Sequence, residues 1–105
     1  MILVTTDFIS GKTLETLGLV RGNTIQCKHI GRDFGAGLKQ LVGGELTGYT
    51  EMMTEAREIA TGRMIQEAYN MGADAIVGIR YASSNVMNSA AEVLAYGTAV
   101  KFVEE

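Results

Sequence analysis

The sequence predicts an α+β (α/β two-layer) fold, a small four-stranded sheet with one short and one long helix on one face. The prediction rests on β-rich segments near both ends of the chain, two helical stretches between them, and the resulting order of strand, strand, helix, helix, strand, strand. Of the 105 residues, 47% are hydrophobic and 20% are charged, which excludes a disordered chain. We expect a single domain over residues 1–105, since domains typically have about 100–150 residues.

Two strands are predicted in the first thirty residues. Residues 2–6 are rich in β-branched side chains, which favours a short first strand. Residues 24–30 alternate, with Cys27 and His29 on the same side of a second strand. Residues 12–19 are ambiguous and fit either one turn of helix or an irregular connection.

A short helix is predicted to begin at Asp33, whose carboxylate can accept hydrogen bonds from the first amides of the helix. Gly43-Gly44 ends it, because glycine readily adopts the left-handed conformation that closes a helix. One face of this helix is apolar, at the spacing i, i+4, i+7, and consists of Phe34, Leu38 and Leu41.

A long helix is predicted from about Thr47 to Met71, and Gly72 follows its end. Gly62 inside this helix, and Gly78 and Gly97 inside strands, are expected to permit close approaches of the backbone. The strongest signal is an apolar stripe at helical spacing, made of Tyr49, Met53, Ala56, Ala60, Met64, Ala68 and Met71.

The last third of the chain predicts two more strands. Residues 75–82 form the first, residues 83–89 a polar connection, and residues 92–103 the last strand. The last strand is apolar on both sides, with Val93, Ala95, Ala99 and Val103 on one and Leu94, Tyr96, Val100 and Phe102 on the other. Strands of this kind are typical of sheets buried on both faces. Because two helices can cover only one face, we expect another copy of the chain to cover the second, in a closed homo-oligomer.

Short blocks spread in order over nearly the whole chain carry a family resemblance. They are Thr5-Thr6, Asp33-Phe34, Gly43-Gly44-Glu45, Tyr49, Ala56-Arg57-Glu58-Ile59-Ala60, Gly72-Ala73-Asp74-Ala75-Ile76-Val77-Gly78 and Gly97-Thr98-Ala99-Val100. On these blocks the chain resembles the YbjQ-like family, described as a "putative heavy-metal-binding domain" of uncharacterised function. The resemblance implies a dodecin-subunit-like fold and a ring-like homo-oligomer, a pentamer. The family pattern does not require Cys27 or His29, so it carries no metal site over to them.

Cys27 and His29 are nevertheless the candidate metal ligands. At positions i and i+2 of a strand they point the same way, and a thiolate with an imidazole suits Zn²⁺ or Cu⁺. Two ligands do not complete a site and the chain has no other Cys or His, so carboxylates or symmetry copies would supply the rest. In the alternative interpretation, Cys27 is a small buried hydrophobe and His29 a polar residue at a strand end.

A row of carboxylates on the long helix, Glu51, Glu55 and Glu58, offers a second candidate. It fits a hard cation or the entrance of a pore between subunits. The alternative is a solvated helix face, whose negative charge favours the positive end of the helix dipole.

Composition and charge narrow the classes of function. The formal net charge is −3 and the basic residues are scattered, which argues against nucleic acid as a partner. No stretch approaches the roughly 20 apolar residues of a membrane span, the start lacks the basic region of a signal peptide, and the single cysteine fits a reducing cytoplasm.

We therefore expect a non-enzymatic, cytoplasmic, homo-oligomeric binding protein whose cofactor is unknown. Its ligand would be a metal ion or small molecule at the subunit interfaces. Two alternatives stay open. One is a metal-handling protein that uses Cys27 and His29. The other is an enzyme of unknown chemistry at a pocket between subunits, which would need a concave site with perturbed titratable groups. Cys27 and His29 could also be interpreted as a nucleophile and its base, but their spacing on a strand does not favour direct contact.

Overall fold

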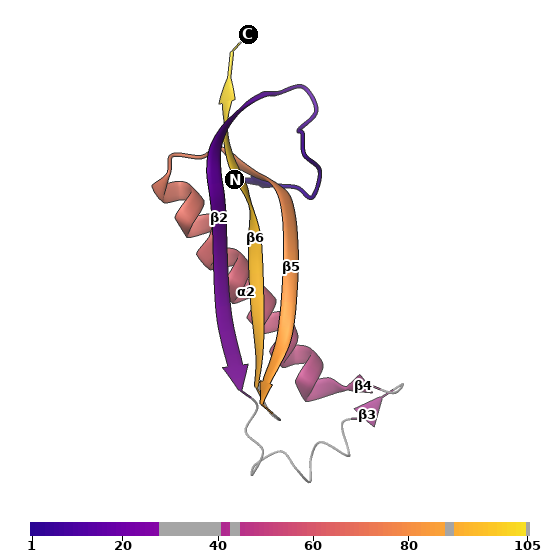
Figure 1. Ribbon diagram of the computed structural model, residues 1–105. Helices are drawn as coiled ribbons and strands as arrows, with labels where there is room; N and C mark the ends of the chain where they lie inside the picture. Colours follow the sequence, from indigo (N-terminus) through magenta and orange to yellow (C-terminus); the bar gives the residue numbers. More distant parts are fainter. Residues whose placement is uncertain (28–40, 43–44, 88–89, 105) are drawn as a thin grey trace.

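Among the described residues, a four-stranded mixed sheet carries one helix on one face, which confirms the α+β prediction (Figure 1). The computed structural model describes residues 1–27, 41–42, 45–87 and 90–104. In the sheet the strands follow the order β1-β5-β6-β2, and β3 and β4 form a separate antiparallel pair. The elements are β1 (Ile2–Leu3), β2 (Thr13–Cys27), β3 (Leu41–Val42), β4 (Glu45–Leu46), α2 (Thr47–Asn70), β5 (Ala75–Met87) and β6 (Ala90–Val103).

Three long strands make up most of the sheet, with β6 antiparallel to both β5 and β2. The short β1 pairs in parallel with the start of β5. Beyond β1, the Gly78 amide donates a hydrogen bond of 2.8 Å to the Thr6 carbonyl, and the Ile79 amide one of 3.2 Å to the Val4 carbonyl. The N-terminal segment thus follows the outer edge of β5 as far as Ile79.

Two predictions of irregular structure are wrong. Residues 12–19 were expected to form a helical turn or a connection, but from Thr13 onward they form the first part of β2, with Thr13 opposite Val103. Residues 83–87, expected to lie in a polar connection, extend β5. A strand ladder is held by backbone hydrogen bonds, so the polar, exposed residues 83–87 could join one without an apolar pattern of their own. In residues 13–19 the irregularity between Thr16 and Gly18 interrupts the alternation of the leucines, of which Leu14 and Leu17 pack against the core.

The predicted short helix lies mostly outside the described residues, as do Asp33 at its expected start and Gly43-Gly44 at its expected end. Leu41 was expected on the apolar face of this helix. It lies instead in β3, where it pairs with Leu46 of β4. The helix prediction is therefore wrong at Leu41, because its backbone is extended and belongs to a ladder.

One face of the sheet packs on α2 along the predicted apolar stripe. Of the stripe residues, Ala56, Ala60, Met64 and Ala68 are buried, whereas Met71 at the end is exposed. Because most of these side chains are alanines, the helix can lie close to the strands. Their partners in the core are Val20 of β2, Ile76 and Ile79 of β5, and Val93, Ala95 and Ala99 of β6.

The closest contact between helix and sheet is at Gly22 of β2. A Cβ atom there would fall on the Ala60 carbonyl oxygen and the Met64 amide nitrogen, and 2.7 Å from the Cβ of Arg63. No side chain fits into this space. Gly22 therefore fixes how closely α2 approaches the sheet.

The three glycines expected to permit close approaches differ from one another. Gly97 behaves as predicted, since its Cβ would lie 2.8 Å from Cγ2 of Ile76. Gly62 faces open space in the single chain, so it permits no close approach within one subunit, and its expected role at a subunit contact stays a prediction. Gly78 has only an ordinary contact of 3.4 Å, but its φ is +62°, at a register shift in the pairing of β5 with β6. Its role is conformational, because L-residues with side chains rarely adopt this φ.

The end of α2 agrees with the prediction. The helix ends at Asn70, and Gly72 follows with a φ of +77°. The Ala73 amide donates to the Ala68 carbonyl at 3.0 Å, which satisfies one of the last carbonyls of the helix.

The second face of the sheet is partly covered by the chain itself. At the upper end of the sheet in Figure 1, a small apolar cluster packs beneath the N-terminal segment. It consists of buried Ala75, Val77 and Val100 with half-buried Val4, Ile9, Leu14 and Phe102. The area that the helix leaves uncovered is therefore smaller than the sequence predicted.

The glycine contacts predict opposite effects of the same substitution at two sites. Gly22→Ala should lower the free energy of unfolding by about 2–3 kcal/mol, because the added methyl group forces α2 away from β2. Gly62→Ala should raise it by about 0.5–1 kcal/mol, the gain in helix propensity at an unobstructed position. Urea denaturation of both variants measures the two changes, and equal effects at both sites would contradict the packing described here.

Candidate functional site

Of the predicted metal pair, the structure places Cys27 alone. Cys27 is the last residue of β2, its side chain is exposed, and it lies opposite Ala90 of β6. His29 is outside the described residues. Within the described ranges, no three His, Cys, Asp or Glu side chains are grouped so that they could hold a metal ion.

The carboxylates of the predicted row, Glu51, Glu55 and Glu58, are all exposed on α2. Exposure in a single chain fits both the solvated face and the entrance of a pore between subunits, so both interpretations stay predictions. In the part of the chain that the structure describes, no helix is both long and apolar enough to cross a membrane.

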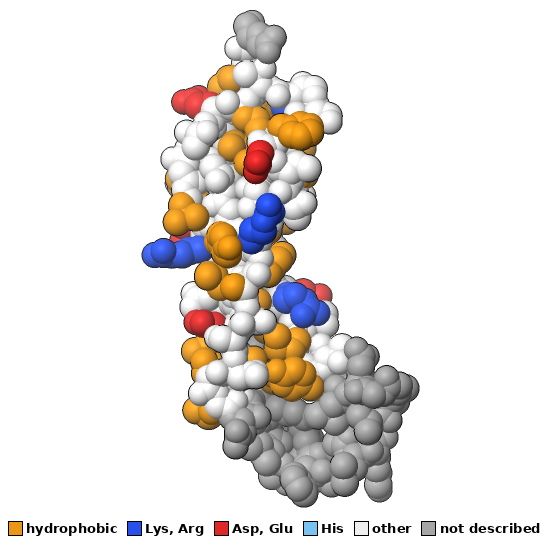
Figure 2. All heavy atoms as spheres, turned by 45° about the vertical axis from the view of Figure 1, so that its right-hand side comes forward, with side chains coloured by type: hydrophobic (Ala, Val, Ile, Leu, Met, Phe, Trp, Pro, Cys, Tyr) orange, Lys and Arg blue, Asp and Glu red, His pale blue; other side chains and the backbone are white. Residues whose placement is uncertain are grey.

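The surface opposite α2 that the N-terminal segment leaves uncovered is called the open sheet face. Leu19 and Ile25 of β2 are 62% and 54% exposed there, and Tyr96 of β6 is 37% exposed. Figure 2, with the β5 side of the molecule turned forward, shows hydrophobic side chains alternating with charged ones along the molecule. By register and alternation the face consists of Leu19, Arg21, Asn23, Ile25 and Cys27 of β2, Arg80, Ala82 and Ser84 of β5, and Glu92, Leu94 and Tyr96 of β6.

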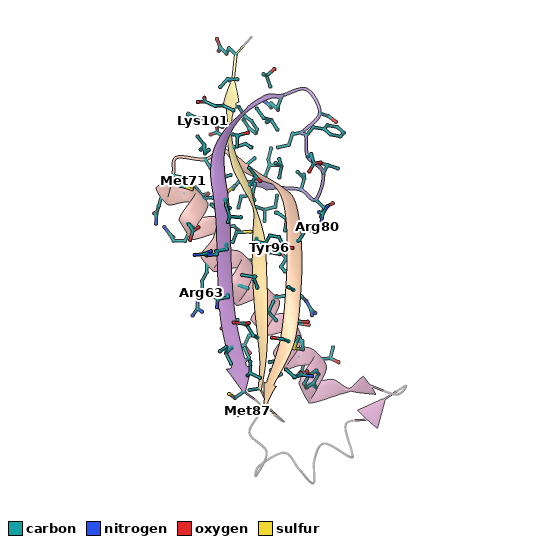
Figure 3. All side chains as sticks on the ribbon, in the orientation of Figure 1. Arg63, Met71, Arg80, Met87, Tyr96 and Lys101 are labelled. Atoms are coloured by element: carbon teal, nitrogen blue, oxygen red, sulfur yellow. The ribbon has the colours of Figure 1, made fainter. Side chains whose placement is uncertain are left out.

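The centre of the open sheet face is a row of one aromatic residue between two arginines. Tyr96 lies opposite Arg21 on one side and opposite Arg80 on the other. Figure 3 shows Tyr96 at mid-length of β6, with Arg80 on the neighbouring strand. Tyr and Arg are enriched at the centres of protein interfaces, because each combines a large contact area with polar groups.

A second feature, the side groove, lies between α2 and β5. Its volume is about 560 Å³, and one wall is closed by a 2.8 Å hydrogen bond between the hydroxyls of Thr61 and Tyr81. Arg57 lies at the groove and donates to the Thr54 hydroxyl at 3.2 Å. The lining consists of Thr54, Arg57, Glu58, Thr61, Gly62, Ile65 and Tyr81. Groups of this kind suit a small, partly apolar ligand with a charged end.

The side groove was not predicted from sequence. Tyr81 comes from a strand and Gly62 and Ile65 from the helix, so only the packing of α2 on β5 brings them together. The missing side chain at Gly62 was the one signal in the sequence, but this glycine was expected to permit a close approach of the backbone.

The outer edge of β2 is partly occupied by side chains of α2. The Arg21 amide donates to Oε1 of Glu67 at 3.3 Å, and Nη1 of Arg63 donates to the Asn23 carbonyl at 2.7 Å. Backbone groups on an edge strand otherwise offer a place for another strand to pair. Arg63 and Glu67 therefore block the middle of this edge.

The comparisons with known proteins agree over nearly the full length. The model of the YbjQ family, described as "Putative heavy-metal-binding", matches residues 1–103. A UPF0145 protein of Clostridium novyi is 65% identical over 103 residues, which cover 98% of this chain and all of that protein. A UPF0145 protein of Vibrio parahaemolyticus is 60% identical, and the match covers 99% of this chain and 100% of that protein. A UPF0145 protein of Methanosarcina acetivorans is 57% identical, and the match covers 98% of each chain.

A solved structure shows the same fold at low sequence identity. It is a protein of unknown function from Pediococcus pentosaceus, assigned to the DUF74 family. The TM-score is 0.65 and the sequence identity 15%, over 98% of both chains.

The contacts at the β2 edge predict a difference between two exposed arginines. Arg63→Met removes the hydrogen bond to the Asn23 carbonyl, and we expect a loss of about 0.5–1.5 kcal/mol in stability and more aggregation on heating. Arg57→Met is the matched control, because in the part of the chain that the structure describes the hydrogen bonds of Arg57 stay within its own helix. Chemical denaturation and light scattering during heating measure both effects, and identical behaviour of the two variants would refute the blocking role.

Proposed function

Because this chain belongs to the YbjQ family, whose function is unassigned, we propose that it is a cytoplasmic, non-enzymatic binding protein built as a homo-oligomeric ring. Five copies form the ring, and the ligand binds between subunits. The observation that carries the proposal is the open sheet face, where the large side chains of Leu19, Ile25 and Tyr96 are exposed on the central part of the sheet. The number five rests on the family resemblance alone.

The shape of the isolated chain supports association. Its radius of gyration is 17.3 Å, whereas a compact chain of about 100 residues has one of about 13 Å. Its accessible surface is 6877 Å², against about 5,700 Å² for a typical monomer of this mass. The excess of about 1,200 Å² is larger than the roughly 800 Å² that each partner contributes to a standard interface.

The chemistry of the open sheet face supports a protein partner rather than solvent. Exposed Leu19 and Ile25 would gain free energy on burial, and Arg21 and Arg80 beside Tyr96 supply the polar groups that orient a partner. A ring requires that two different surfaces of each copy meet, so that the rotation repeats until it closes. The open sheet face is one of these two surfaces.

The proposal predicts that a charge on the open sheet face breaks the assembly. Leu19→Glu should weaken each contact by about 2 kcal/mol, roughly 30-fold in affinity, because a carboxylate would have to be buried. Folding should persist, because Leu19 is exposed within one chain and Arg21 lies on the same face. Light scattering and native mass spectrometry of the wild type and the variant report the subunit number.

The matched control for this experiment is Ser10→Glu. Ser10 is exposed in the N-terminal segment, away from the open sheet face, and the variant should assemble like the wild type. Wild-type protein that stays monomeric at working concentrations would overturn the proposal.

A metal-handling function is the second candidate, favoured by the exposed thiol of Cys27 and by the family description. On this alternative, copies of Cys27 and His29 from several subunits supply the ligands that one chain lacks, and Zn²⁺ or Cu⁺ is the metal. A ring brings equivalent side chains together around its axis, which gives the second candidate the same structural premise as the first.

Titration of the metal-free protein with Zn²⁺ and with Cu⁺ separates the two candidates. Metal handling predicts stoichiometric binding at micromolar affinity or tighter, lost in Cys27→Ser, with assembly unchanged by light scattering. Absence of binding by the wild type would remove the metal candidate and leave the first untouched.

A further inference from the structure

The two edges of the sheet are protected to different extents. Glu67 and Arg63 occupy the middle of the β2 edge, and the N-terminal segment covers the β5 edge as far as Ile79. Below that point, Tyr81–Met87 is exposed at every residue. Within the described ranges, no backbone group of Tyr81–Met87 bonds to anything outside the ladder with β6.

The direction of the backbone groups on this edge follows from the ladder. The Arg21 amide bonds outward to Glu67, so Tyr96, its partner on β6, turns its amide and carbonyl toward β5. Arg80, opposite Tyr96, therefore points its own groups back at β6. The backbone amide and carbonyl of successive strand residues point alternately to the two sides of the strand, and the register with β6 is unbroken from residue 80 to residue 85. The amides and carbonyls of Tyr81, Ser83 and Asn85 therefore point away from the sheet.

The composition of this edge is unusual for a solvent-exposed strand. Tyr81–Met87 contains no charged residue and no proline. Natural edge strands are usually protected by lysines, prolines, bulges or covering segments, because an open edge pairs with other chains. A register shift between Asn85 and Met87 ends the regular ladder, so Tyr81–Asn85 is the stretch that has none of these protections and has the properties of a strand that another strand covers.

We propose that Tyr81–Asn85 is a docking edge on which an extended segment of a second copy pairs through backbone hydrogen bonds. The sheet then continues from one subunit into the next. This inference rests on the proposed function, and it specifies which part of each subunit receives its neighbour.

Position on the molecule supports a second copy as the occupant. Ala82 and Ser84 lie in the same cross-strand rows as Leu94 and Glu92, so the docking edge is continuous with the open sheet face. A copy that covers the open sheet face past β5 therefore reaches this edge. The excess surface of the single chain is present in every copy, and a second copy buries it without any further component.

The docking edge also completes the side groove. Tyr81 is both the first residue of the edge and a wall of the groove, where its hydroxyl meets that of Thr61. A strand added beside Tyr81 would place its own side chains at the open rim of the groove, alternately on the helix side of the sheet. The ligand-binding space between subunits would thus be built from α2 and β5 of one copy and a strand of the next.

A proline at one position tests pairing through the backbone. Ser83→Pro removes an outward amide and leaves the bonds between β5 and β6 intact, and proline is tolerated on edge strands. The matched control is Ser83→Val, which changes the side chain and keeps the amide. We expect Ser83→Pro to reduce the subunit number by native mass spectrometry and light scattering, and Ser83→Val to assemble like the wild type.

Hydrogen exchange gives a second measurement that needs no variant. In the assembled wild type, the amides of Tyr81, Ser83 and Asn85 should exchange at least 10-fold more slowly than in protein dissociated by Leu19→Glu. Should Ser83→Pro prove unfolded by circular dichroism, Ser83→Lys replaces it, because an edge lysine also blocks pairing.

The outcomes separate the two proposals. Monomeric wild type would overturn the proposed function and this inference with it. Assembled wild type with an assembled Ser83→Pro variant and rapid exchange of the three amides would overturn the docking edge alone. A third outcome is that the three amides exchange rapidly in the pure assembly and slowly only after an unrelated extended peptide is added. That result would overturn the second copy as the occupant of the docking edge.

Discussion

The fold depends on one geometric constraint, which is that the only helix among the described residues is shorter than the sheet it covers. The 24 residues of α2 span about 36 Å, whereas the 15 residues of β2 span about 50 Å. The helix reaches close contact by means of Gly22 and the alanines at positions 56 and 60. The N-terminal segment covers part of the second face, and what remains becomes the open sheet face. Core, open face and uncovered edge are therefore consequences of the same shortage of covering layers.

Sequence reasoning was successful where a periodic pattern reflects one local environment. The stripe through Ala56, Ala60 and Met64 identified α2 and its buried side, and β6 was correctly described as apolar on both sides. It failed where backbone pairing alone decides the structure. Residues 13–19 and 83–87 are strands because β6 lies beside them; the first segment has an interrupted alternation and the second is polar, so neither shows a regular strand pattern.

The candidate site was less predictable than the fold, for a related reason. Cys27 and His29 were chosen as candidates because their residue types and spacing can be recognised in the sequence. Of the two, Cys27 is described by the structure and His29 is not. The side groove and the unprotected edge depend on the register of β5 against β6 and on how α2 crosses them. In the sequence Tyr81 is one more strand residue, and only the fold brings its hydroxyl within 2.8 Å of the Thr61 hydroxyl.

The attachment of the N-terminal segment has its own consequence. Residues 2–6 join β5 through a two-residue parallel pairing and a few hydrogen bonds, to Ile76, Gly78, Ile79 and Arg80. All of these contacts would form equally well with the same segment donated by another molecule, because they depend on local sequence and not on chain connection. A domain-swapped assembly would therefore differ from an unswapped one mainly in the entropy of the linking residues, and protein concentration during folding would set the proportion of the two.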